Sequence, residues 1–130
     1  MTTRPHRPET GSVSLEAVLI LPVVLVTLLA VIQVTLWAYA DRVTDTAARE
    51  GARAARLSGL PADGEARAED FLRRLGATTV LTPNVTARVT ATGVTVEVHG
   101  LAATLLPAFR LAVAGHSSGA IERFDPGVIP

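Results

Sequence analysis

Residues 17–40 contain no charged side chain, and this apolar run constrains the fold more than any other feature of the chain. Only Thr27, Gln33 and Thr35 interrupt a sequence of otherwise apolar residues. A helix rises about 1.5 Å per residue, so the run forms a helix of roughly 36 Å, whereas the hydrocarbon core of a bilayer is about 30 Å thick. We therefore predict a transmembrane helix over residues 12–40.

The segment before the helix, residues 1–11, is polar and contains Arg4, Arg7 and two prolines, so we expect an unstructured leader. The apolar run is longer than the hydrophobic region of a secretory signal peptide, and no small-x-small cleavage site follows it. We therefore expect the helix to be retained. The arginines leave its orientation open, because Arg4 and Arg7 precede the helix and four others follow it: Arg42, Arg49, Arg53 and Arg56.

Residues 41–58 continue the helical pattern beyond the membrane. The apolar side predicted for this extension consists of Val43, Ala47, Ala54 and Leu57. We expect two stabilising ion pairs, Asp45 with Arg49 and Glu50 with Arg53. Helix-breaking residues Gly59 and Pro61 predict the end of the helix.

The remaining sequence predicts a small α+β domain over residues 59–124, followed by a tail at 125–130. A short amphipathic helix begins at Asp63 as its cap, and its apolar residues are Ala68, Phe71, Leu72 and Leu75. After Gly76 the apolar period changes from 3.6 to 2, which predicts an antiparallel sheet of about three strands. The third strand is expected over residues 111–124, with Leu111, Val113 and Ile121 facing inward.

Two alternating segments on either side of Thr92 and Gly93 predict a β-hairpin. A two-residue loop at Thr92 and Gly93 would place Val89 opposite Val96 and Arg88 opposite Glu97. The apolar face of this hairpin must be buried against another element, and we expect the extension of the long helix, residues 41–58, to pack on it.

Several patterns that resemble reactive or binding sites have simpler explanations. Residues 115–119 spell G-x-S-x-G, but no histidine follows Ser117, so we do not expect a hydrolase. The histidines His6, His99 and His116 are widely separated and the chain has no cysteine, so neither a metal site nor a cofactor is expected. The formal net charge of +0 argues against nucleic acid as a partner.

Glu16 lies alone at the start of the apolar run, five residues after Gly11. Burying a carboxylate costs about 2.5–3.5 kcal/mol at the centre of a membrane helix and less near the interface, so a charge adjoining the core is a functional candidate. Alternatively, Glu16 simply marks the edge of the bilayer near the positive end of the helix dipole. The residue pattern alone leaves both interpretations open.

The spacing of Gly11 and Glu16 resembles the processing site of type IV prepilins. Two further strings, Glu16-Ala-Val-Leu-Ile-Leu-Pro22 and Ala48-Arg-Glu-Gly-Ala-Arg53, are similar to those of TadE-like minor pseudopilins of tight-adherence (Flp) pilus systems, of the Arg-rich, Lys-free actinobacterial type. The departures from the prepilin pattern are Ser12 after the glycine and Thr10 before it.

This resemblance implies a non-enzymatic structural component in the assembly of a Flp pilus or a related secretion system. It implies a cytoplasmic leader that a prepilin peptidase removes between Gly11 and Ser12, and an extracytoplasmic domain. Glu16 would pair with the new amino group during assembly, Pro22 would aid packing, and the implied family motif after the membrane comprises Arg49, Glu50, Gly51 and Arg53.

The partners implied are the lipid bilayer, the peptidase, other Tad/Flp pseudopilins and pilin, and the membrane platform of the pilus. The alternative is an unprocessed single-pass protein that carries a membrane-anchored interaction domain and has no pilus role.

Overall fold

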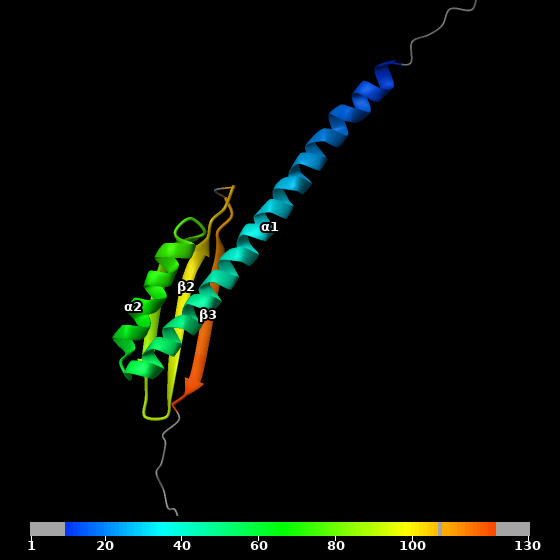
Figure 1. The fold of residues 1–130 in the computed structure, drawn as a ribbon. Helices are drawn as coiled ribbons and strands as arrows, with labels where there is room; N and C mark the ends of the chain where they lie inside the picture. Colours follow the sequence, from blue (N-terminus) through cyan, green and yellow to red (C-terminus); the bar gives the residue numbers. More distant parts are fainter. Residues whose placement is uncertain (1–9, 107, 122–130) are drawn as a thin grey trace, which may run out of the picture. The chain divides into compact units, whose positions relative to one another are not determined.

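The computed structural model describes residues 10–106 and 108–121. It contains a long helix, a short helix with a single π-helical turn, and a three-stranded antiparallel sheet, which confirms the predicted α+β fold. The chain divides into two compact units, residues 1–34 and residues 35–130, and helix α1 (Thr10–Ser58) runs through both (Figure 1).

The described part of the first unit, residues 10–34, contains most of the apolar run of α1. Its described side chains from Ser14 onward are almost all exposed, and the most apolar stretch of α1 has a mean hydropathy of 2.8. By length and composition α1 can cross a membrane, and it is the one such helix among the described residues. The hydroxyl of Thr27 donates to the carbonyl of Val23 at 2.8 Å, which satisfies a polar group in an apolar setting.

In the second unit, α1 packs through a stripe of mainly small residues: Ala40, Val43, Thr44, Ala47, Ala48, Gly51, Ala52 and Ala55 are buried. These positions recur every three or four residues, which places them on one face of the helix. The prediction is confirmed for Val43 and Ala47. It is wrong for Leu57, which is 83% exposed, because close packing here selects small residues over large apolar ones. Ala54 is only half-buried.

Helix α1 ends at Ser58, and Gly59 adopts a φ of +74°, a conformation that glycine reaches at little cost. Helix α2 (Pro61–Phe71) follows, with Pro61 in its first turn. The predicted cap at Asp63 is wrong, because Leu60 is the N-cap residue and Asp63 lies within the first turn. A π-helical turn, η1 (Leu72–Gly76), completes the segment.

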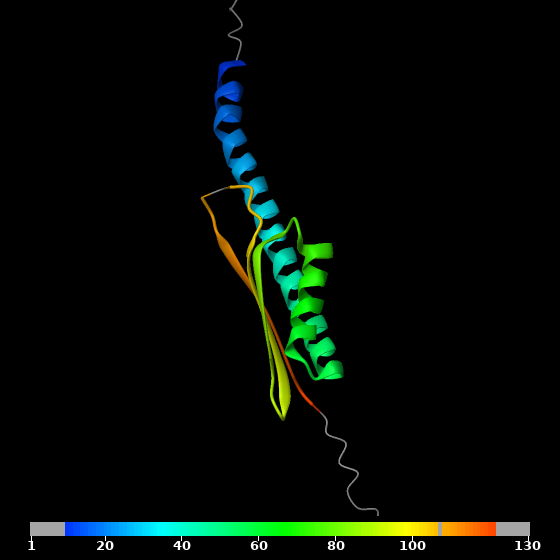
Figure 2. The ribbon, with the colours of Figure 1, turned by 90° about the vertical axis from the view of Figure 1, so that its left-hand side faces the viewer.

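Strands β1 (Val80–Val89), β2 (Gly93–Ala102) and β3 (Leu111–Ala120) form a sheet in the order β1-β2-β3. The core is centred on Val94, Val96 and Val98 of β2, which are 0–1% exposed. The second half of α1 and helix α2 lie on the same face of the sheet (Figure 2). The extension of α1 therefore packs on the apolar face of the hairpin, as predicted. Val113 is buried as predicted, and the half-buried Leu111 and Ile121 also pack against the core, which confirms their inward direction.

The predicted hairpin exists, but its register differs by two residues. Val89 pairs with Val94, and Arg88 pairs with Thr95 rather than with Glu97. The backbone N–H of Thr90 donates to the carbonyl of Gly93 at 2.8 Å, and the N–H of Gly93 donates to the hydroxyl of Thr90 at 3.1 Å. The bond to the hydroxyl of Thr90 closes the loop one residue earlier than predicted. Because the strand pairing shifts by two residues, every side chain stays on the face of the sheet that the sequence predicted.

Strand β3 ends at Ala120 in the structure, whereas the sequence predicted a strand to residue 124. Residues 122–124 of that predicted strand, the predicted tail at 125–130 and most of the predicted leader lie outside the described residues.

Candidate functional site

Gly11 and Ser12 lie in the first turn of α1, which begins at Thr10. Glu16 is four residues after Ser12, so the two lie on the same side of the helix about 6 Å apart along its axis. The side chain of Glu16 is exposed. Because the influence of the helix dipole falls off within the first turn, it offers Glu16 little stabilisation at this second-turn position.

Pro22 lies inside α1 without ending it. Proline has no backbone N–H, so the carbonyl of Val18, four residues earlier, receives no helical hydrogen bond from this position. The side chain of Pro22 is exposed together with its apolar neighbours. The helix therefore has one weakened turn in its apolar half.

The charged residues of the segment 49–53 face solvent and the neighbouring helix. Arg49 pairs with Asp45 at 2.6 Å, as predicted. The carboxylate of Glu50 pairs with Arg67 of α2 at 3.3 Å, rather than with the predicted partner Arg53. Arg53 is exposed beside this pair. Exposed pairs of this kind contribute about 0–1 kcal/mol each, and only the pair of Glu50 with Arg67 joins α1 to α2.

Gly51 lies where α1 packs closely against α2. A Cβ atom at Gly51 would lie 2.7 Å from the carbonyl oxygen of Gly64 and 3.0 Å from the Cβ of Ala68. A Cβ at Gly64 would in turn lie 2.8 Å from the Cβ of Ala55. The sequence singled out Gly51 but missed Gly64, although the Gly64 and Ala68 spacing of four residues is the pattern of a small-residue helix face.

The G-x-S-x-G string lies entirely in strand β3 and not in a strand-to-helix turn. A Cβ at Gly115 would overlap the backbone carbonyl of Thr44 in α1, and a Cβ at Gly119 would lie 2.7 Å from the guanidinium of Arg56. Ser117 pairs with Val96 of β2 in the register of the sheet. The glycines of this string therefore allow α1 to lie against the sheet.

The structure brings together two histidines that the sequence treats as unrelated. His99 and His116 flank Glu97 on the outer face of the sheet, with nitrogen-to-oxygen distances of 3.9 Å and 3.8 Å. All three side chains are exposed. Within residues 10–106 and 108–121, no group of three or more acidic or histidine side chains is placed to hold a metal ion.

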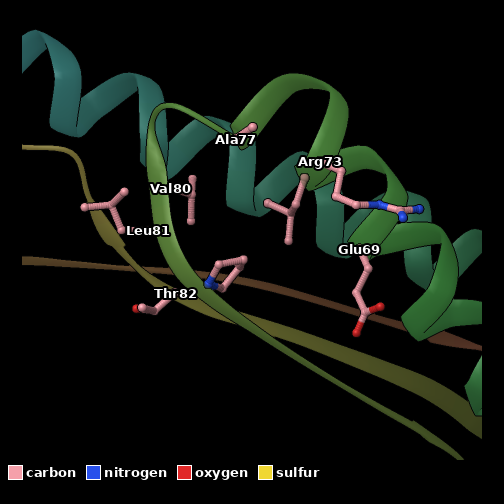
Figure 3. A pocket seen from close by; sticks show the side chains of 8 residues that line it. Glu69, Arg73, Ala77, Val80, Leu81 and Thr82 are labelled. Atoms are coloured by element: carbon pink, nitrogen blue, oxygen red, sulfur yellow. The ribbon is translucent and has the colours of Figure 1, made fainter.

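A groove of about 430 Å³ lies between α2, η1 and the first residues of β1 (Figure 3). Its lining is mostly apolar, and the side chains of Glu69 and Arg73 point in different directions. Arg73 pairs instead with Asp70 at 3.1 Å. The groove therefore lacks the converging polar groups that a substrate site normally presents.

Residues 11–53 match the family model described as TadE-like protein. The match contains Gly11, Glu16, Pro22 and the segment 49–53, and it confirms the family resemblance over this part of the chain. It supports a role associated with tight-adherence pili in general, in a family of structural components. No curated protein and no solved structure matches the chain.

Proposed function

We propose, from the TadE-like match over residues 11–53, that this protein is a pseudopilin that acts in the assembly of a Flp-type pilus or a related secretion system. The observation that carries the proposal is that one helix contains the Gly11 and Glu16 pair, the apolar span and the segment 49–53. In this proposal the protein is a structural component of the actinobacterial type and catalyses no reaction.

The proposal assigns the leader to the cytoplasm and the sheet domain to the outside of the cell. The positions of the arginines do not decide this orientation, so it rests on the family resemblance alone. An exposed cysteine in the β1–β2 loop tests it, since the chain has no native cysteine. The variant Ala91→Cys should react with a membrane-impermeant maleimide in intact cells. Reaction only after lysis would place the domain in the cytoplasm.

The proposed processing step is hydrolysis of the peptide bond between Gly11 and Ser12 by a prepilin peptidase. This bond lies in the first turn of α1, where the N–H groups have no helical partners and unwinding breaks few hydrogen bonds. Cleavage would create an amino group at Ser12, one helical turn from Glu16. An ion pair between these charges, within one subunit or between neighbours, gains strength in the low dielectric of the membrane.

Pro22 and the segment 49–53 have supporting roles in this proposal. The weakened turn at Pro22 lets the apolar half of α1 adjust as the subunit packs against pilin, other pseudopilins or the membrane platform. Gly51 holds α1 close to α2, while Arg49 and Arg53 remain exposed for contact with these partners.

Co-expression with the cognate prepilin peptidase, followed by intact-mass measurement, tests the processing step. We expect loss of residues 1–11 from the wild type and from the matched control Ser14→Ala, and retention of the leader in Gly11→Ala. A full-length mass for the wild type would refute cleavage. It would favour the alternative, an unprocessed membrane-anchored interaction domain.

A further inference from the structure

We propose that the described part of the connection between β2 and β3, residues 103–106 and 108–110, is a second membrane contact that inserts into the interfacial layer of the bilayer. The occupant of this surface is the lipid of the membrane that α1 crosses. The inference requires that α1 spans the bilayer, but it does not depend on cleavage of the leader or on a pilus role.

Large apolar side chains are exposed along this connection. Leu105 is 51% exposed, Leu106 is 42% exposed and Phe109 is 57% exposed. The connection lies at the end of the sheet opposite the β1–β2 hairpin (Figures 1 and 2), whose described loop residues Ala91 and Thr92 are small. Neighbouring exposed apolar groups of this kind can form a binding surface. Leu57 and Leu60, at the turn between α1 and α2, are also exposed, so exposure alone does not identify the membrane contact.

A direct contact fixes the start of β3 near the end of the apolar run. The indole N–H of Trp37 donates to the carbonyl of Ala112 at 3.4 Å, three residues after Phe109. Trp37 lies one helical turn before Asp41, the first charge after the run. Tryptophan is enriched at the boundary between hydrocarbon and headgroups, so this bond places the neighbouring connection at the same depth.

Three polar groups in the described part of the connection donate hydrogen bonds within the protein. The N–H of Phe109 donates to the carbonyl of Leu106 at 3.1 Å, which closes a turn. The hydroxyl of Thr104 donates to the same carbonyl at 2.9 Å. The N–H of Ala103 donates to Thr79 at 2.8 Å. Satisfied polar groups lower the cost of moving backbone from water into the interface.

The charge of this region also fits a lipid surface. No acidic residue occurs between Glu97 and Glu122, whereas Arg110 directly follows the apolar turn and is exposed. An arginine at this depth can extend its guanidinium to lipid phosphates while its apolar stem stays among the acyl chains. The partner with the matching chemistry is therefore a membrane with anionic headgroups.

The test uses the full-length protein in vesicles of phosphatidylethanolamine and phosphatidylglycerol. An environment-sensitive fluorophore is attached to Leu106→Cys, to Phe109→Cys and to the matched control Ala91→Cys in the hairpin loop. Lipids brominated in the acyl chains should quench the probes at 106 and 109 severalfold more strongly than the probe at 91. Circular dichroism should show that each variant keeps the wild-type fold.

Two outcomes would overturn the proposal. Weak quenching at 106 and 109, no stronger than at 91, would show that the connection stays in water. A blue-shifted emission at 109 that disappears on dilution with excess lipid, without bromine quenching, would show that a second copy of the chain covers this surface instead. A Leu106→Ser and Phe109→Ser double variant should weaken the quenching of a probe at Leu105→Cys without loss of fold.

Discussion

A single added methyl group at Gly115 should separate α1 from the sheet. The Cβ atom in Gly115→Ala would overlap the carbonyl of Thr44 and lie 2.5 Å from the amide nitrogen of Asp45. Both are backbone atoms in the middle of a helix, so no side-chain rotation relieves the overlap. Carbon contacts are favourable at about 3.5–4.0 Å, so α1 must retreat by about 1 Å.

The loss of stability in Gly115→Ala can be estimated from the close packing of small residues around this position. Inserting a methyl group into a packed core costs about 1–3 kcal/mol, and a rigid neighbour favours the upper end of that range. A gap of about 1 Å also forfeits up to half of each dispersion contact along the stripe that includes Ala47 and Ala48. We expect a loss of about 3 kcal/mol, a large part of the roughly 5–13 kcal/mol typical of a domain of about 90 residues.

Thermal unfolding in mild detergent measures this loss, with Trp37 as the reporter because it is the sole tryptophan and bonds to β3. A change of 3 kcal/mol corresponds to a fall in Tm of about 12–24 °C in a domain of this size. The control Ala114→Val, on the outer face of the same strand, should change stability by under about 0.5 kcal/mol. A Tm for Gly115→Ala within about 4 °C of the wild type would refute the close packing of α1 on β3.

The same assay tests two further contacts. Gly51→Ala should lower the free energy of unfolding by about 1–2 kcal/mol, because its Cβ would lie 2.7 Å from the carbonyl oxygen of Gly64. This loss is net of the roughly 1 kcal/mol by which alanine favours a helix over glycine. A variant more stable than the wild type would contradict this packing. Glu65→Ala should lower the free energy of unfolding by about 1–2 kcal/mol, because the Glu65 carboxylate accepts a hydrogen bond from the N–H of Ala87 at 3.0 Å. Glu65→Gln should recover part of this loss. Equal losses in both variants would argue against the hydrogen bond.

The order and type of the elements follow from local patterns, and for this reason the sequence predicts them well. The apolar run, the Gly59 and Pro61 stop signal and the change of period after Gly76 each depend on neighbours in the chain. The helix, the short helix and the three strands all appear in the structure.

The features that sequence reasoning missed depend on contacts between elements. Leu57 is more apolar than alanine or glycine, yet α1 buries alanines and Gly51 and leaves Leu57 exposed. The buried face of α1 contacts both α2 and the sheet so closely that large side chains do not fit there. The hairpin register depends on the hydroxyl of Thr90, whose hydrogen bond to Gly93 is not visible in an alternating pattern.

The residues of the candidate site also fall into those that the sequence could identify and those that depend on contacts between elements. Gly11, Glu16 and the segment 49–53 could be singled out because their spacing is local and resembles a known family. By contrast, the approach of His99 and His116 to Glu97 depends on the pairing of β2 with β3. The apolar surface at Leu105 and Phe109 gains its significance only from the bond between Trp37 and Ala112.

The most direct test of the proposed role in pilus assembly is a count of surface pili by electron microscopy in the cell of origin. Removing the gene should abolish the pili, and the wild-type chain should restore them. Glu16→Ala should fail to restore them, while the control Glu69→Ala, which removes an exposed charge on α2, should succeed. Normal pili in the absence of the gene would contradict the proposed function.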